Sequence, residues 1–266
     1  MSNLLRRAKR RIGHYWNYRY LPLYWWFHKY KFGVKNTKFD ISWCVFLESF
    51  IQDQYDIRRF LDSIKQANNL FFIDIGRNHG FVFFYTMYHI MRSNFDTSTI
   101  KYIGIDPSPL KFVYFNYFKF LRQADIDIDY HLLDKAVVFN DASHAKLKYG
   151  EKNFGNFNIS GSNYAQKLAR RQNQFSYVDI TVETISVKEI KEIIAEHKSS
   201  DAMMIKIDCK NQTTRLFMET LDILNDYDKP YLVACEKDSS IETDLSSYSK
   251  PGFNVLTASN AFKKTS

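Results

Sequence analysis

The sequence has few cysteines and no long apolar run. Its three cysteines, Cys44, Cys209 and Cys235, are too few and too widely spaced for a disulfide framework or a Cys-x-x-Cys metal site. No stretch of about 18 or more apolar residues occurs, and the first residues lack the apolar core of a signal peptide. We therefore expect a cytoplasmic protein in a reducing compartment, neither secreted by that route nor spanning a membrane.

Acidic residues are absent from residues 1–39, which contain ten lysines and arginines. The formal net charge of +8 is therefore +10 from this segment and −2 from the remaining 27 basic and 29 acidic residues. Tyrosines and tryptophans lie among the cations, a mixture that suits the headgroup layer of an anionic membrane. It also fits packing against the domain or against a second copy of the chain, or binding of single-stranded nucleic acid. Because the rest of the chain is slightly acidic, we favour peripheral attachment to the cytoplasmic face of a membrane over nucleic acid.

Alternating strand-like and helix-like segments predict an α/β domain. With 266 residues and 45% hydrophobic content, the chain can bury the core of one such domain and still carry an appendage. We divide it into a basic aromatic helical extension, 1–40, and a domain, 41–266, with an insertion at 140–176. The expected strands are 70–75, 101–106, 128–133, 135–139, 177–183, 202–208, 230–236 and one within 251–257, and the expected helices are 45–67, 80–92, 109–122, 186–197 and 212–224. This order predicts a mostly parallel twisted sheet with helices on both faces, and we expect the insertion to lie over the site and recognise an acceptor.

The strongest motif is residues 71–80, an apolar run that leads into Asp74 and then a glycine-containing turn. A helix-like segment follows, so the loop would point backbone N–H groups and a positive helix end at a ligand. The next predicted strand ends in Asp106, Pro107 and Ser108, where a carboxylate can accept both hydroxyls of a ribose. Together these features predict a nucleoside-cofactor site at the carboxyl edge of a parallel sheet.

The spacing of the loop indicates which cofactor it would bind. Its register is D-x-G-x-N-x-G, with Asn78 where a dinucleotide-binding G-x-G-x-x-G motif has its second glycine. A side chain there crowds a pyrophosphate, whereas Asn78 and the loop amides can bond the carboxylate and ammonium of an amino acid. These features favour S-adenosylmethionine, and no phosphate-binding G-x-x-x-x-G-K-[ST] motif occurs. The alternative is that Gly76 and Gly80 merely permit a tight turn.

Five segments follow one another in a characteristic order: Asp74 to Gly80, Gly104 to Pro109, Leu133 to Val137, Val182 to Ile190 and Ile205 to Asp208. In this order they resemble the landmarks of the FkbM-type methyltransferases: D-x-G-A-N-x-G, E/D-P-S/N-P, N-x-A-V, a valine-threonine helix entry and I-K-I-D-x-E-G. The resemblance spans residues 50–257. It implies a class I, Rossmann-like methyltransferase fold and methyl transfer from S-adenosylmethionine, often to a sugar hydroxyl of a glycan or glycosylated metabolite.

Two departures from the family pattern affect this interpretation. The loop has Arg77 and His79 where the family has alanine and an aliphatic residue, so it is bulkier and more polar. After Asp208, the family's acid-glycine pair is replaced by Lys210 and Asn211. If that acid is needed for chemistry, the chain would be a scaffold or regulatory subunit that keeps the methyltransferase fold without turnover.

Acidic residues end five of the predicted strands: Asp74, Asp106, Asp134, Asp208 and Glu236. Because ligands of open parallel sheets bind beyond the carboxyl ends of the strands, we expect these acids to converge on one crevice. We assign Asp74 to the loop that would hold the methionine end, Asp106 to the ribose, and Asp134 to the adenine amine. The other candidate cofactor-binding residues are Gly76, Asn78, Gly80, Pro107, Ser108 and Ala136.

Methyl transfer to a hydroxyl needs a base that removes the proton. Asp208 is our first choice, with Glu236 beside the acceptor, Lys206 as an orienting cation, and His79 or His144 as alternative bases. The structural alternatives are a helix cap for Asp208 and an ion pair within the sheet for Lys206. No group of histidines or acids has convincing metal spacing.

The sequence therefore predicts an O-methyltransferase that acts on a sugar hydroxyl of a glycan or lipid-linked saccharide, of the kind found in surface polysaccharides, at the cytoplasmic membrane face. The first alternative is the inactive scaffold. The second is a nucleic-acid methyltransferase that uses residues 1–39 as a stacking arm.

Overall fold

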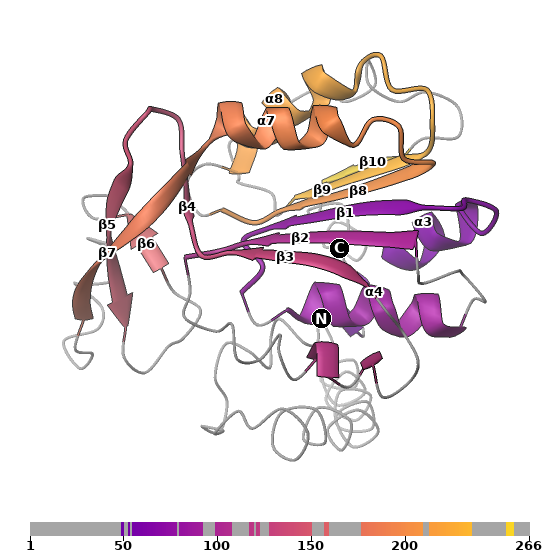
Figure 1. The fold of residues 1–266 in the computed structure, drawn as a ribbon, viewed down its shortest axis with the longest axis horizontal. Coiled ribbons are helices and arrows are strands. Elements are labelled where there is room, and N and C mark those ends of the chain that lie inside the picture. The colour runs from indigo at the N-terminus through magenta and orange to yellow at the C-terminus, as the bar shows by residue number, and fades with distance from the viewer. Residues whose placement is uncertain are drawn as a thin grey trace, which may run out of the picture.

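The computed structural model describes residues 49–50, 53, 55–78, 80–92, 99–107, 117–119, 121–122, 128–150, 157–159, 177–209, 213–235 and 254–257. Its centre is a six-stranded parallel sheet, with the strand order β10-β9-β8-β1-β2-β3 (Figure 1). The strands are β1 (Leu70–Ile75), β2 (Ile100–Ile105), β3 (Asp129–Leu133), β8 (Ala202–Ile207), β9 (Tyr231–Cys235) and β10 (Asn254–Thr257). Numbered along the chain, these strands have the order 3-2-1-4-5-6 of a doubly wound Rossmann-like sheet.

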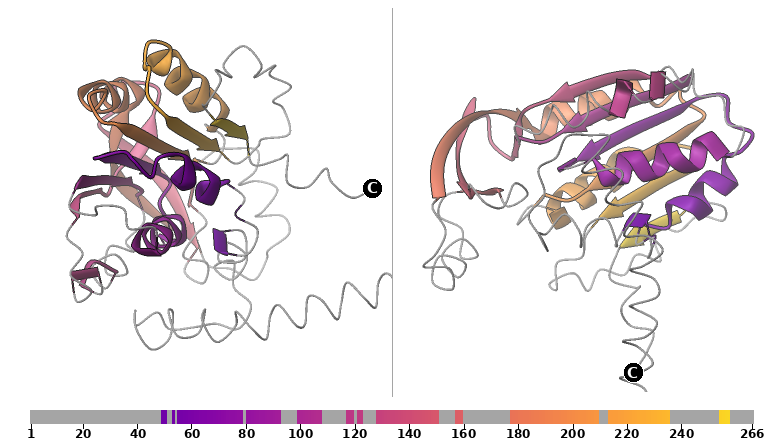
Figure 2. Two further views of the ribbon diagram at one scale, coloured as in Figure 1. Left: turned by 90° about the vertical axis from the view of Figure 1, so that its right-hand side faces the viewer. Right: turned by 90° about the horizontal axis from the view of Figure 1, so that it is seen from below.

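Helices cover both faces of this sheet (Figure 2). The helices α3 (Ile57–Ser63) and α4 (Phe81–Arg92) lie on one face, and α7 (Val187–Glu196) and α8 (Thr213–Leu224) lie on the other. Strands β1, β8 and β9 are buried along their whole length, which explains why they read as continuous apolar runs. Alternate residues of β1, β2, β8 and β9 enter two separate cores, so Phe72 packs with α4 and Phe71 with α7.

The N-terminus of α7 is set by a capping box. The Ser186 hydroxyl accepts a hydrogen bond from the Glu189 N–H at 3.2 Å, and the Glu189 carboxylate accepts one from the Ser186 N–H at 2.7 Å. Because this reciprocal pair satisfies amides that have no partner within the helix, the chain turns from β7 directly into α7.

A second, four-stranded sheet has the order β4-β7-β5-β6 and stands beyond the carboxyl end of β3 (Figure 1). Its strands are β4 (Ala136–Val138), β5 (His144–Gly150), β6 (Phe157–Ile159) and β7 (Tyr177–Ser186). The insertion predicted at 140–176 is therefore partly regular structure, because β5 and β6 lie within it. Strand β5 pairs antiparallel with residues 177–183 of β7. Parallel pairing with β4 extends β7 beyond the predicted end at residue 183, to Ser186.

Most of the other predicted boundaries are confirmed to within one residue. The continuous helix predicted over 45–67 is wrong: Asp53 and Asp56 adopt positive φ angles of 47° and 52°, and α3 begins only at Ile57. In the helix predicted over 109–122, the structure describes helical residues at 117–119 and 121–122. The extension 1–40 lies outside the described residues. Within the part that is described, no helix has the length and apolar character needed to cross a membrane.

Candidate functional site

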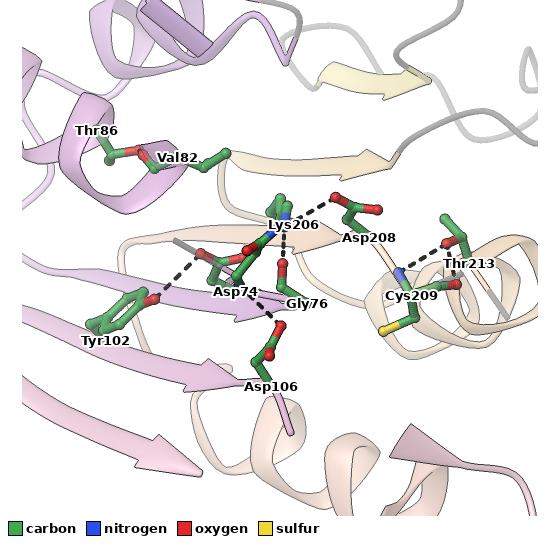
Figure 3. Close-up of polar contacts among 11 residues, drawn as sticks. Asp74, Gly76, Val82, Thr86, Tyr102, Asp106, Lys206, Asp208, Cys209 and Thr213 are labelled. Carbon is green, nitrogen blue, oxygen red and sulfur yellow. Dashed lines mark hydrogen bonds and ion pairs between the residues drawn. The ribbon is translucent and has the colours of Figure 1, made fainter. Parts of the chain in front are cut away.

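The order of the central sheet reverses between β1 and β8, its topological switch point. Connections leave these neighbouring strands in opposite directions, and ligands of open α/β sheets bind beyond the carboxyl ends of the strands at such a point. The two strands stay paired to their last residues, and the Asp208 N–H then donates to the Ile75 carbonyl at 2.8 Å. The loop after β1 and the start of the segment after β8 are thus held side by side (Figure 3).

The loop after β1 has three residues in the left-handed region. The φ angles are 78° at Gly76, 45° at Asn78 and 74° at Gly80. A Cβ atom at Gly76 would lie 2.1 Å from the Asp208 carbonyl oxygen, so no larger residue fits there. The loop therefore passes directly against the backbone that follows β8.

The amides of this loop are engaged within the protein. The N–H groups of Gly76 and Arg77 donate to the Ile105 carbonyl at 2.8 and 3.3 Å, and the Gly80 N–H donates to the Arg77 carbonyl at 2.8 Å. The Asn78 N–H donates to Asp106 Oδ2 at 3.0 Å. The expectation that loop amides bind an amino-acid carboxylate thus does not fit these four N–H groups. By contrast, Asn78 Oδ1 is enclosed and has no hydrogen-bond partner among the described residues, so it could accept a bond from a ligand.

Asp74 and Lys206 form a buried ion pair beneath the loop. They are paired across β1 and β8, their side chains are 0% and 3% exposed, and Lys206 Nζ lies 3.1 Å from Asp74 Oδ1. The ammonium also donates to the Gly76 carbonyl, while the Tyr102 hydroxyl donates to Asp74 Oδ2 at 3.3 Å (Figure 3). The alternative interpretation of Lys206, an ion pair within the sheet, describes its position. Neither side chain has a surface to offer an acceptor, so both support the loop.

Burial has opposite effects on the two members of this pair. It raises the pKa of Asp74, and the nearby Lys206 ammonium only partly offsets this rise. Burial alone would lower the pKa of Lys206, but the carboxylates of Asp74 and Asp208 outweigh it and raise the pKa above its ordinary value. Lys206 therefore stays protonated at neutral pH and holds two carboxylates and a carbonyl together.

Asp208 is the accessible member of this group. Its side chain is 29% exposed, and its Oδ2 lies 3.8 Å from Lys206 Nζ. The Thr213 hydroxyl, at the start of α8, accepts from the Cys209 N–H at 3.0 Å and donates to the Cys209 carbonyl at 2.7 Å. These bonds hold the backbone that directly follows Asp208, whose carboxylate stays partly exposed at the sheet edge.

Asp106 and Asp134 are held by the loop in different ways. Asp106 is buried and fixes the loop through Asn78, and Pro107 beside it is partly buried. Asp134 is 38% exposed, and its Oδ1 lies 2.8 Å from Arg77 Nη2, whose side chain is fully buried. The acid predicted to meet an adenine amine thus meets a guanidinium. Sequence reasoning treated Arg77 only as a bulky loop residue; Gly104, which makes room for the arginine stem, was the signal that could have placed it.

The remaining candidates are divided between other places. Ala136 is buried at the start of β4 and pairs with Thr184 in the second sheet. His144 lines a separate groove of about 530 Å³, whose charged residues are Lys135, Asp141, Glu183, Lys188, Glu189 and Glu192. That groove includes none of the residues at the β1–β8 edge. His79, Ser108, Glu236 and the Lys210-Asn211 pair lie outside the described residues. No group of side chains within the described ranges is arranged to hold a metal ion.

Comparisons with protein-family models, with curated proteins and with solved structures found no match. The Rossmann-like description of the fold therefore depends on the observed sheet order, and the family resemblance depends on the sequence motifs alone.

Proposed function

We propose that this protein is an S-adenosylmethionine-dependent methyltransferase whose acceptor is a sugar hydroxyl of a glycan or lipid-linked saccharide. The observation that carries the proposal is the left-handed loop at the switch point of the sheet, directly beside Asp106 at the end of β2. In doubly wound sheets this is where a nucleoside cofactor binds.

The residues of the edge fit two parts of such a cofactor. The enclosed Asn78 Oδ1 is an acceptor suited to the ammonium of the methionine end. A carboxylate accepts several hydrogen bonds, so the bond from Asn78 to Asp106 leaves a role in binding ribose hydroxyls compatible with this geometry. When bound, the cofactor would supply an electrophilic methyl group.

The chain itself would have to position the acceptor and remove its proton. Asp208 is the accessible carboxylate at this edge and takes the hydroxyl proton as the oxygen–methyl bond forms. Lys206, 3.8 Å from Asp208, positions the carboxylate and the loop rather than contacting the acceptor. Glu236, which we predict to border the acceptor, lies outside the described residues.

Transfer of a tritiated methyl group from S-adenosylmethionine into glycan and lipid-linked saccharide extracts tests this proposal. We expect incorporation with the full chain and a loss of at least about 100-fold in rate with Asp208→Asn, the contribution typical of a general base. Asp222→Asn, which changes a carboxylate on α8, is the matched control and should retain the wild-type rate. Incorporation that is absent, or equal in Asp208→Asn, contradicts the proposal.

A second candidate, the methyltransferase-fold scaffold without turnover, is favoured by two observations. The loop amides are internally bonded, and Arg77 is bonded to the acid predicted to meet the adenine. The scaffold predicts no methyl incorporation into any extract, together with an intact fold and no measurable cofactor affinity.

Attachment to an anionic membrane through residues 1–39 is a separate proposal that rests on their cations and interleaved aromatic residues. Flotation of the full chain and of a 1–39 deletion with phosphatidylserine vesicles tests it. Loss of flotation on deletion supports membrane attachment, whereas salt-dependent RNA binding lost on the same deletion supports the nucleic-acid alternative.

A further inference from the structure

Arg77 spans three strands at the carboxyl edge of the central sheet. It begins in the loop after β1, and its stem lies so close to Gly104 of β2 that a Cβ atom there would be 2.7 Å from Arg77 Cδ. Its guanidinium then reaches Asp134, after β3, at 2.8 Å. We call this connection the Arg77–Asp134 bridge.

The bridge connects the same strand ends as a nucleoside cofactor bound at this edge. With the amino-acid end at the loop after β1 and the ribose at Asp106 after β2, the base lies toward the end of β3. Asp134 is the carboxylate at that end, and Gly104 is the residue of β2 that directly precedes Ile105 and Asp106. The guanidinium and the base would therefore compete for the same place and for the same acceptor.

We propose that the Arg77–Asp134 bridge is a gate at the base end of the cofactor crevice, which must open before an adenosine group can bind. The inference rests on the proposed function, because it assumes a nucleoside ligand at this edge. It adds a residue that sets affinity and selectivity, because Arg77 opposes binding of the base.

The two ends of the bridge differ in a way that lets it open. The Arg77 side chain is fully buried, but Asp134 is 38% exposed and can be hydrated once the guanidinium leaves. A closed state that dominates the population weakens the apparent affinity by the fraction of molecules that are open. If about one molecule in ten is open, removing the gate tightens binding about 10-fold.

Titration calorimetry of S-adenosylhomocysteine, adenosine and methionine into the full chain tests the gate. Arg77→Ala removes the bridge, and Arg77→Met keeps an unbranched stem over Gly104 but has no guanidinium, so it serves if the alanine variant does not fold. Arg59→Ala removes an equal charge from a solvent-exposed arginine on α3 and is the matched control. Near-ultraviolet circular dichroism establishes that each variant is folded.

We expect Arg77→Ala and Arg77→Met to bind S-adenosylhomocysteine and adenosine about 10-fold more tightly than the wild type, with methionine and Arg59→Ala unchanged. Equal binding by the wild type and the Arg77 variants, or weaker binding by the variants, overturns the gate and leaves the proposed function intact. Methionine binding that tightens by the same factor as adenosine binding also overturns the gate. If no folded variant binds any adenosine ligand at millimolar concentration, both the gate and the proposed function fail.

Discussion

The edge of the central sheet and the groove beside the second sheet both carry ion pairs, but in opposite environments. At the edge, Asp74 and Lys206 are buried and 3.1 Å apart. In the groove, Lys135 and Glu183 are 4.0 Å apart, with side chains 32% and 68% exposed. Both regions have carboxylates and lysines close together.

The difference shows that a buried charge depends on its partner more than an exposed charge does. A charge buried in an apolar sheet is tolerated only when a partner and hydrogen bonds compensate for its lost hydration. Lys206 meets this requirement with Asp74 and the Gly76 carbonyl, and as a result it fixes the loop after β1. The Lys135–Glu183 pair in the groove is partly hydrated, so neither charge depends on its partner to the same degree.

Lys206→Met should destabilise the protein most. It leaves the Asp74 carboxylate buried without a cation, which costs about 3–5 kcal/mol in free energy of unfolding at neutral pH. Urea unfolding measures this loss, and adding Asp74→Leu to the same chain should restore most of it because no buried charge remains. A loss below about 1 kcal/mol would show that the pair is not truly buried.

The deficit of the Lys206→Met variant, its loss in free energy of unfolding relative to the wild type, should also be smaller in acid. Burial already raises the pKa of Asp74, and losing the cation raises it further, so the folded state takes up a proton before the unfolded state does. The deficit is therefore largest at neutral pH and shrinks as the pH falls through the raised pKa toward the ordinary value of 3.8. A deficit that is independent of pH would contradict this explanation.

Gly76→Ala should cost about 3 kcal/mol, because the residue has a positive φ angle and a methyl group would overlap the Asp208 carbonyl. Gly104→Ala is the informative comparison. Its methyl group would meet the flexible Arg77 stem and the Tyr102 hydroxyl rather than backbone, so its cost should be smaller. Urea unfolding of both variants gives the order, and a larger loss at Gly104 would contradict it.

Glu189→Gln should have a small, pH-dependent effect. Bonds from the Ser186 backbone N–H and hydroxyl lower the pKa of Glu189 below its ordinary value of 4.5. This contribution is therefore present above pH 4.5 and is lost as the pH falls through the lower folded-state pKa. Glutamine keeps the hydrogen bonds but not the charge, so we expect a loss of about 0.5 kcal/mol at neutral pH that disappears in acid. An equal loss at both pH values would assign the effect to the hydrogen bonds alone.

Lys135→Met, in the groove, should change the free energy of unfolding least, by about 0.5 kcal/mol or less. It makes the same substitution as Lys206→Met in an exposed pair, so the ratio of the two losses measures how much burial contributes. Losses of similar size would remove the distinction between the two regions.

Much of the central sheet could be predicted because its strands are long apolar runs. β1 and β8 are buried on both faces, so each appears in the sequence as an apolar run that can be recognised without knowing which strands it pairs with. β5 was missed because lysines occupy its alternate positions and it is ordered by pairing with β7. The alternation of Ala145, Leu147 and Tyr149 in the sequence was the available signal.

The site was predicted by position more successfully than by role. Asp74, Asp106, Asp134 and Asp208 do lie at or next to the carboxyl ends of strands, as a parallel sheet requires. Their partners could not be predicted, because cross-strand register decides that Lys206 faces Asp74 and a side chain's path decides that Arg77 reaches Asp134. Such contacts depend on three-dimensional packing that motif spacing does not encode.

Calorimetric titration of S-adenosylhomocysteine into the wild type and Asp106→Ala measures whether a nucleoside binds at this edge of the sheet. We predict saturable binding by the wild type and at least about 10-fold weaker binding by a folded Asp106→Ala, because the hydrogen bonds that a carboxylate makes to hydroxyls contribute about 1.5–3 kcal/mol. Absence of heat at millimolar ligand, or equal affinity in the two proteins, would contradict a nucleoside site at this edge.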